Sequence, residues 1–188
     1  MKTAIANLRS VSPYSQSAFH QTPKLDKESA DDYERRTWRE RCHVIEDGHL
    51  FIPPMAFKNC LSEAAQFLSQ KVRGKGQATW TKHFKAGVLV TDPLVLPIKK
   101  TDVPGEWLMM NANGKPGVGS RVPRCYPLIP RWSGGVTFSI IDNEITEAAF
   151  TEHLKQAGML IGIGRFRPIN RGFYGRFEVV SVEWMDQR

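Results

Sequence analysis

Residues 145–184 of this chain read ITEAAFTEHLKQAGMLIGIGRFRPINRGFYGRFEVVSVEW. A helix is predicted over residues 145–157, where Thr146 can cap the first turn and Gly158 is expected to end the last one. Three apolar residues share one face of that helix: Phe150, Leu154 and Ala157. Residues 177–184 alternate between two sets of side chains, which predicts a final, half-buried strand. The chain therefore ends in a helix, a loop and a strand.

The loop between that helix and that strand, residues 162–177, is rich in glycine. It holds four glycines, four arginines and four aromatic residues, and it has no Asp or Glu. Glycine lets a backbone approach a partner closely, guanidinium groups pair with phosphate, and aromatic faces stack on bases. The pattern indicates contact with nucleic acid, although ordinary turns with solvated arginines have a similar composition. Six residues of the loop are expected to bind: Arg165, Arg167, Arg171, Phe173, Tyr174 and Arg176.

The rest of the chain supplies a second helix and three more strands. The helix is expected to open at Pro53 and Pro54 and to end before Gly74. Its apolar stripe follows helical spacing: Phe57, Leu61, Ala64, Ala65, Leu68 and Val72. The strands are predicted over residues 3–11, 87–97 and 136–141. The order β–α–β–β–α–β predicts an α+β fold with a ferredoxin-like, RRM-like core, in which two helices cover one face of a four-stranded antiparallel sheet.

Two polar stretches do not fit this core and are expected to be insertions in a single domain of residues 1–188. The first, residues 14–50, contains a predicted short helix near 31–41 and a hairpin with Asp47 and Gly48 at its tip. The second, residues 99–131, is rich in Gly and Pro and is the candidate for a protruding hairpin.

The charge of the chain favours a polyanionic partner. The formal net charge is +7, and half of the 26 Lys and Arg residues lie in three windows without any Asp or Glu: residues 71–85, 115–131 and 162–176. Outside the glycine-rich loop, the residues expected to bind are Arg73, Lys75, Lys82, Lys85, Arg121 and Arg124. If the windows converge in space, they form the electrostatic footprint of a nucleic-acid-binding protein.

Several classes of protein are disfavoured by the sequence. The three cysteines are widely spaced, which argues against a disulfide scaffold or a zinc site and favours a reducing compartment. No stretch approaches the roughly 18 apolar residues of a membrane span, and the first residues lack the apolar core of a signal peptide. We therefore expect a cytoplasmic protein with no membrane partner, no metal and no cofactor.

Two segments resemble motifs of the RAMP superfamily, the ferredoxin-like RNA-binding proteins of CRISPR effector complexes. Residues 51–61, FIPPMAFKNCL, resemble the family's motif at the first helix, and residues 162–177 resemble its glycine-rich loop. Lys58 matches the family's lysine and is also expected to bind nucleic acid, whereas Asn59 replaces a glycine. Three residues stand where the family often has Gly-Ser-Ser and remove hydroxyl and amide contacts to phosphate: Pro54, Met55 and Ala56.

The resemblance implies a function. Backbone subunits of the family grip a guide RNA with the sheet face and the glycine-rich loop, stack in several copies along it, and press a hairpin between its bases; residues 99–131 would be that hairpin here. We expect a non-catalytic protein that binds a single-stranded nucleic acid, with RNA favoured over DNA as its identity. It is expected to assemble with copies of itself or with related RAMP subunits. Such a chain could serve a CRISPR-type effector, a phage or a mobile element.

Two alternatives remain at this stage. One is a metal-independent endoribonuclease that uses His20 or His83 as general acid or base. His43, His49 and His153 are weaker candidates, because the first two flank a predicted hairpin tip and the third lies on a helix. The other alternative is a decoy that mimics a RAMP subunit and docks into an effector complex.

Trp80 and Phe84 can equally stack on bases or cover the preceding helix.

Overall fold

An antiparallel four-stranded sheet forms the centre of the computed structural model, which describes residues 1–112, 117 and 119–186. Its strands lie in the order β4-β8-β1-β9. Their bounds are β1 (Lys2–Ser10), β4 (Val88–Leu89), β8 (Ser133–Ile140) and β9 (Phe177–Asp186). Helix α2 (Pro54–Leu68) follows β1, and α4 (Glu147–Gln156) follows β8. The chain order β1–α2–β4–β8–α4–β9 confirms the predicted α+β, ferredoxin-like core.

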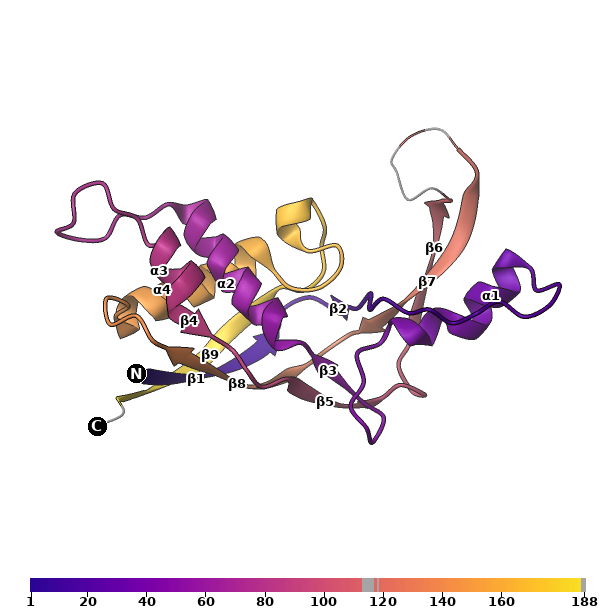
Figure 1. The fold of residues 1–188 in the computed structure, drawn as a ribbon, viewed down its shortest axis with the longest axis horizontal. Coiled ribbons are helices and arrows are strands. Elements are labelled where there is room, and N and C mark those ends of the chain that lie inside the picture. The colour runs from indigo at the N-terminus through magenta and orange to yellow at the C-terminus, as the bar shows by residue number, and fades with distance from the viewer. Residues whose placement is uncertain (113–116, 118, 187–188) are drawn as a thin grey trace.

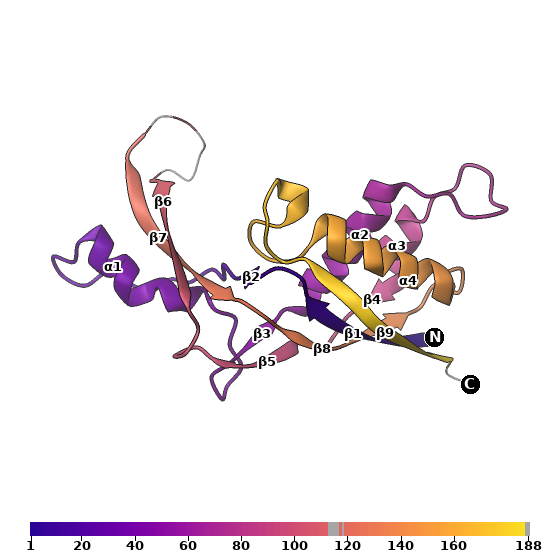
Figure 2. The same ribbon diagram turned by 180° about the vertical axis from the view of Figure 1, so that it is seen from behind.

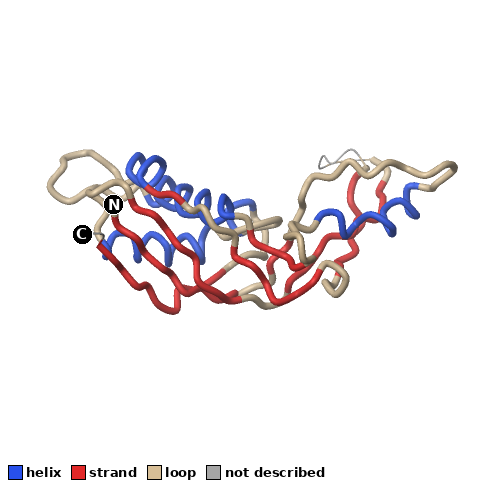
Figure 3. The backbone as a smooth tube through the Cα atoms, turned by 60° about the horizontal axis from the view of Figure 1, so that its bottom comes forward, coloured by secondary structure: helices blue, strands red, loops and turns tan. Residues whose placement is uncertain are grey.

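Helices α2 and α4 lie together on one face of this sheet, whereas α1 lies at the other end of the molecule (Figure 3). Ala4, Ala6 and Leu8 of β1 are buried against them, and the two small side chains leave room for the rings that fill the core. Four of those rings are fully buried: Phe57, Phe138, Phe150 and Phe177. Burial of such a ring stabilises the fold by roughly 1.5–3 kcal/mol. The core therefore holds α2 and α4 against the sheet.

The predicted strand over residues 87–97 is wrong in detail. The chain forms β4, bends at residues 91–93, and then forms β5 (Leu94–Lys99), which pairs with β3 (His49–Ile52) instead of the central sheet. Proline lacks the N–H that a sheet ladder needs, so Pro93 separates the two strands. A helix that the sequence did not reveal, α3 (Thr81–Gly87), precedes β4. Helix α2 also ends earlier than predicted, at Leu68, where Ser69 adopts a left-handed conformation.

The end of α4 differs from the prediction as well. Thr146 caps the helix as expected, since its hydroxyl accepts a hydrogen bond from the Ala149 N–H at 3.2 Å. Gly158, however, does not end it, because the chain continues as a π-helical turn over Ala157–Ile161. A Cβ atom at Gly158 would lie 2.1 Å from the Phe177 carbonyl oxygen. The glycine is needed for close packing against β9 and not for a stop.

The two polar stretches lie outside the four-stranded sheet. They form a three-stranded sheet in the order β2-β7-β6, with short helices packed beside it. Their elements are β2 (Tyr14–Ser15), α1 (Ala30–Thr37), the 3-10 helix η1 (Trp38–Arg41), β6 (Gly105–Asn111) and β7 (Arg121–Ile129). Strands β6 and β7 pair as the predicted protruding hairpin, at the end of the molecule away from both termini (Figures 1 and 2). Lys115, which opens the second basic window, lies outside the described residues.

A buried carboxylate attaches α1 to the hairpin. Glu34 is fully buried and accepts hydrogen bonds from Arg41 at 2.7 Å, from Arg124 at 2.9 Å and from the Cys125 backbone N–H at 2.7 Å. Burial alone would raise the pKa of Glu34, but these donors outweigh it and hold that pKa below its usual range. The base of the hairpin is therefore fixed by charge. Within the described part of the chain, no helix is both long and apolar enough to cross a bilayer.

Candidate nucleic-acid interface

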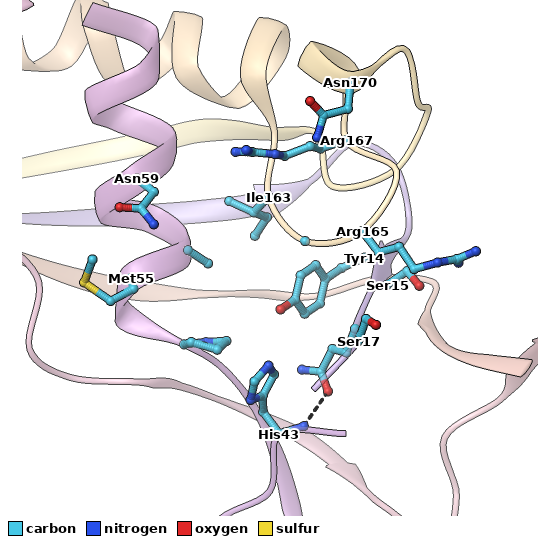
Figure 4. A pocket seen from close by; sticks show the side chains of 14 residues that line it. Tyr14, Ser15, Ser17, His43, Met55, Asn59, Ile163, Arg165, Arg167 and Asn170 are labelled. Atoms are coloured by element: carbon cyan, nitrogen blue, oxygen red, sulfur yellow. Dashed lines mark hydrogen bonds between the residues drawn. The ribbon is translucent and has the colours of Figure 1, made fainter. Parts of the chain in front are cut away.

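The two motifs singled out in the sequence meet around one pocket of about 500 Å³. The start of α2 forms one wall, the glycine-rich loop a second, and the segment after β1 a third (Figure 4). None of the described residues that line it is acidic. The lining residues include Tyr14, Gln16, Ser17, His43, Met55, Asn59, Gly164, Arg167 and Asn170.

Helix α2 points its N-terminus at this pocket. Pro53 is the N-cap and Pro54, which has no N–H, is the first helical residue; the Ala56 N–H donates to the Pro53 carbonyl at 2.9 Å, and no side chain caps this turn. The first turn contains no acid, and Met55, Ala56 and Asn59 all line the pocket. Because the N-terminal end of a helix carries partial positive charge, this wall attracts anions without any lysine.

Backbone hydrogen bonds hold the glycine-rich loop against the segment after β1. The Arg165 N–H donates to the Ser15 carbonyl at 3.0 Å, and the Gly175 N–H donates to the Pro13 carbonyl at 2.7 Å. Within the loop, the Ile163 N–H donates to the Gly175 carbonyl at 3.0 Å. A short 3-10 helix, η3 (Pro168–Asn170), forms its crest. These hydrogen bonds therefore fix the position of the loop where it lines the pocket.

Three of the four arginines of the loop are engaged within the protein. The Arg165 side chain is only 10% exposed and stacks between the rings of Tyr126 and Phe166, at 3.4 and 3.9 Å from their centroids. Burial lowers the pKa of Arg165. Figure 4 shows this side chain directed away from the pocket. Arg167 forms an ion pair with Glu63 at 2.9 Å.

Arg176 donates to the carbonyl oxygens of Met159 and Phe173, at 3.1 and 3.2 Å. Arg171 is exposed. Phe173 is 63% exposed, while the Tyr174 hydroxyl donates to the Glu106 carboxylate on β6. The loop thus presents Arg171 and Phe173 outward and uses its other predicted binding residues largely to hold its own shape.

The other predicted binding residues also divide into engaged and exposed groups. The Lys58 ammonium donates to the Phe84 and Lys85 carbonyls at 3.1 and 2.8 Å, and burial lowers the pKa of Lys58. It therefore caps the C-terminal end of α3. Two more form ion pairs, Lys75 with Glu144 at 2.7 Å and Arg124 with Glu34. The remaining four are exposed: Arg73, Lys82, Lys85 and Arg121.

The three basic windows do not converge on the pocket. Window 71–85 lies at one end of the molecule, the glycine-rich loop in the middle and the hairpin at the other end. All three lie along the same long side, the upper side in Figures 1 and 2. The three windows are therefore spread along one side of the backbone and do not form one cluster.

The two histidines proposed for catalysis lie outside the pocket. His83 of α3 is 8% exposed and hydrogen-bonds to Asp142 at 2.7 Å, and His20 lies against Thr22 and Tyr33. His43, which the sequence ranked lower, does line the pocket, and burial lowers the pKa of its imidazole. Its position eight residues before the first motif was the only signal in the sequence.

Packing distinguishes the two roles that the sequence left open for Trp80 and Phe84. Phe84 is fully buried and the Trp80 ring packs edge-on against it, which favours the covering role over base stacking. Among the described residues, no cluster of His, Cys, Asp and Glu could hold a metal ion.

No protein-family model matches the sequence, and no curated protein matches it. The fold is similar to a chain in the cryo-EM structure of the Type III-B Cmr-beta bound to cognate target RNA, with a TM-score of 0.53 and 12% identity. The match covers 98% of this chain and 60% of that one, so this chain spans about 60% of its length. It is also similar to Cmr6 from Pyrococcus furiosus, with a TM-score of 0.48 and 15% identity over 96% and 98% of the two chains. At such identities the likeness is one of fold.

Proposed function

We propose that this protein binds single-stranded RNA without cleaving it and grips the phosphate backbone at the pocket between α2 and the glycine-rich loop. The observation that carries the proposal is the pocket itself. An uncapped, acid-free helix N-terminus faces a loop that holds Arg167 and Asn170, and no acid lines the space between them among the described residues. This combination suits a phosphate group.

Two further features support the proposal. The stretches that contain the exposed basic residues lie along one side of the backbone with the glycine-rich loop between them, so a strand that runs along this side would pass all three. The fold is also similar to that of a chain in an assembly that is bound to target RNA. The contacts would be largely independent of sequence, and several copies, or related RAMP subunits, would bind along one strand.

The test is fluorescence anisotropy with a labelled single-stranded RNA. Asn59→Asp places a carboxylate at the pocket wall without changing the shape of the side chain, and we expect the affinity to fall about tenfold. Gln66→Glu on the same helix is the matched control, because Gln66 is exposed and does not line this pocket. Equal losses in both variants would remove the pocket from the binding site. Stronger binding to DNA of the same sequence would reassign the ligand.

A second function, metal-independent cleavage of RNA, has one observation in its favour. His43 lies in the pocket with a lowered pKa, so its imidazole is neutral near pH 7 and can accept the proton of a ribose 2′-hydroxyl. Labelled RNA incubated with the protein in EDTA separates the two functions. Full-length RNA after incubation supports binding alone, whereas fragments that disappear with His43→Ala would establish the nuclease.

A further inference from the structure

We infer that a second pocket, between the glycine-rich loop and the β6–β7 hairpin, holds one unstacked nucleobase of the bound strand. The inference rests on the proposed function, because the base arrives with the RNA. The pocket measures about 390 Å³, within the range of about 300–1,000 Å³ that small-molecule sites occupy. The residues that line it include Glu106 and Leu108 of β6 and four residues of the loop: Phe166, Arg171, Phe173 and Tyr174.

Phe166 is the first element of this pocket. Its φ of +53° lies in the left-handed region, which costs a bulky residue on the order of 1–3 kcal/mol. The Phe166 carbonyl accepts a hydrogen bond from the Tyr174 N–H at 3.0 Å, and this bond holds the conformation. A Cβ atom at Gly172 would lie 1.7 Å from the same carbonyl oxygen, so the loop closes only with glycine there. The structure thus sustains backbone strain around an aromatic ring that stays 41% exposed.

A buried cation lies behind the same ring. The Arg165 guanidinium stacks on Phe166, its terminal nitrogens are buried, and it forms an ion pair with the Glu106 carboxylate at 3.7 Å. The guanidinium is attracted to the ring face that it contacts, and Phe166 as a whole stays 41% exposed. A π-stacking ligand would use the exposed part of this strained ring.

Phe173 supplies the second stacking surface. It is 63% exposed and meets Tyr174 edge-to-face, with centroids 5.9 Å apart and planes at 70°. Tyr174 in turn is fixed by its hydrogen bond to Glu106, which ties the loop to the hairpin. Phe166 and Phe173 are both exposed and both line this pocket, which favours a ligand with a flat apolar face. Every base has such a face, so the pocket would accept any of the four.

The position of the pocket links it to the strand. Asn170 lines both this pocket and the pocket at α2, so the two lie on either side of the loop crest. Arg171 is exposed at the rim and can contact the phosphate that accompanies the base. A nucleotide strand crossing the crest would place a phosphate on one side and one base on the other.

The experiment compares two oligomers of the same length in fluorescence anisotropy. One is a fully abasic ribose-phosphate strand, and the other is the same strand with a single central adenine. We expect the wild-type protein to bind the strand with adenine about tenfold more tightly, since stacking one base contributes on that scale. The double variant Phe166→Leu, Phe173→Leu keeps apolar volume but removes the flat faces, so it should bind both strands equally and as tightly as the wild type binds the abasic one.

Phe67→Leu is the control, because Phe67 is 57% exposed on α2 and lies outside the pocket; it should retain the tenfold preference. Thermal unfolding checks the fold, and Phe173→Leu alone serves if the double variant unfolds, since it changes only an exposed side chain. Equal wild-type affinity for the two strands, or an unchanged preference in the Phe variants, would overturn the base pocket while the proposed function stands. Failure to bind either strand would overturn both.

Discussion

The glycine-rich loop and the window at residues 71–85 are both strongly basic, yet their charged side chains have different surroundings. In the glycine-rich loop, Arg165 is stacked between rings and Arg167 is paired with Glu63. In the window at residues 71–85, Arg73 and Lys82 are exposed to solvent. A paired or buried guanidinium builds the protein, whereas an exposed one attracts a polyanion from a distance. Under the proposed function, the loop would give the site its shape and the exposed window would supply its long-range attraction.

The largest expected effect concerns a charge that builds structure at the hairpin. Glu34→Gln leaves Arg41 and Arg124 beside a neutral amide, and we expect a loss of about 3 kcal/mol in the free energy of unfolding. Urea unfolding measures it. Glu178→Gln, in the exposed pair with Arg9, is the control and should stay within about 0.5 kcal/mol of wild type. Similar values for the two variants would contradict the structural role of Glu34.

The same carboxylate predicts a pH dependence. Its pKa is lowered in the folded protein, so its stabilising effect is fully present above the unfolded-state pKa of about 4.3 and is lost as the pH falls through the lower folded value. Below about pH 4, the wild-type urea midpoint should therefore fall more steeply than that of Glu34→Gln. Parallel curves would mean that Glu34 does not contribute to acid sensitivity.

The next effect compares the two basic regions directly. Arg165→Ala removes both cation–π contacts and leaves a gap in a buried stack, so we expect about 2 kcal/mol less stability. Arg73→Ala should leave the stability unchanged, because Arg73 is exposed. Thermal unfolding of both variants distinguishes them. A stable Arg165→Ala protein with weakened RNA binding would instead make Arg165 a direct ligand.

A smaller effect should appear in binding alone. The triple variant Arg73→Ala, Lys82→Ala, Lys85→Ala removes exposed charge, and we expect about tenfold weaker RNA binding at low salt with an unchanged melting temperature. The slope of log K against log salt should shrink by about 2. Lys27, Lys99 and Lys155 are also exposed, and changing these three to Ala is the charge-matched control. Equal losses in both triple variants would show that only net charge matters.

The smallest effect concerns the exposed arginine of the loop. Arg171→Ala should weaken RNA binding about threefold and leave the fold intact, because a single surface phosphate contact contributes less than 1 kcal/mol. Arg171→Lys should restore most of the affinity if the contact is electrostatic. A loss larger than that of the triple variant would reverse the division of roles between the two regions.

Local signals made much of the fold predictable. Pro53 and Pro54 mark the start of α2, Thr146 caps α4, and periodicity places the first and last strands of the sheet. What failed depends on contacts between distant residues. Gly158 resembles a stop in the sequence, but its real role is to pack against Phe177.

The candidate site was predictable only in part. The two motifs meet in space and line one pocket. The partners of their charged residues were not visible, because Arg167 lies 104 positions from Glu63 and Lys58 reaches carbonyls of a helix that the sequence did not reveal. His43 is a weak candidate in the sequence because it flanks a predicted hairpin tip, and only the folded chain brings it to the pocket at α2.

The most direct test of the central claim is the salt dependence of RNA binding by the wild-type protein. Fluorescence anisotropy with a single-stranded RNA of about 16 nucleotides, between about 50 and 200 mM salt, gives the slope of log K against log salt. We expect tight binding at low salt and a linear fall with a slope of about −2 to −4, as several phosphate contacts require. No binding at low salt, or an affinity that does not change with salt, would contradict a protein that grips the phosphate backbone.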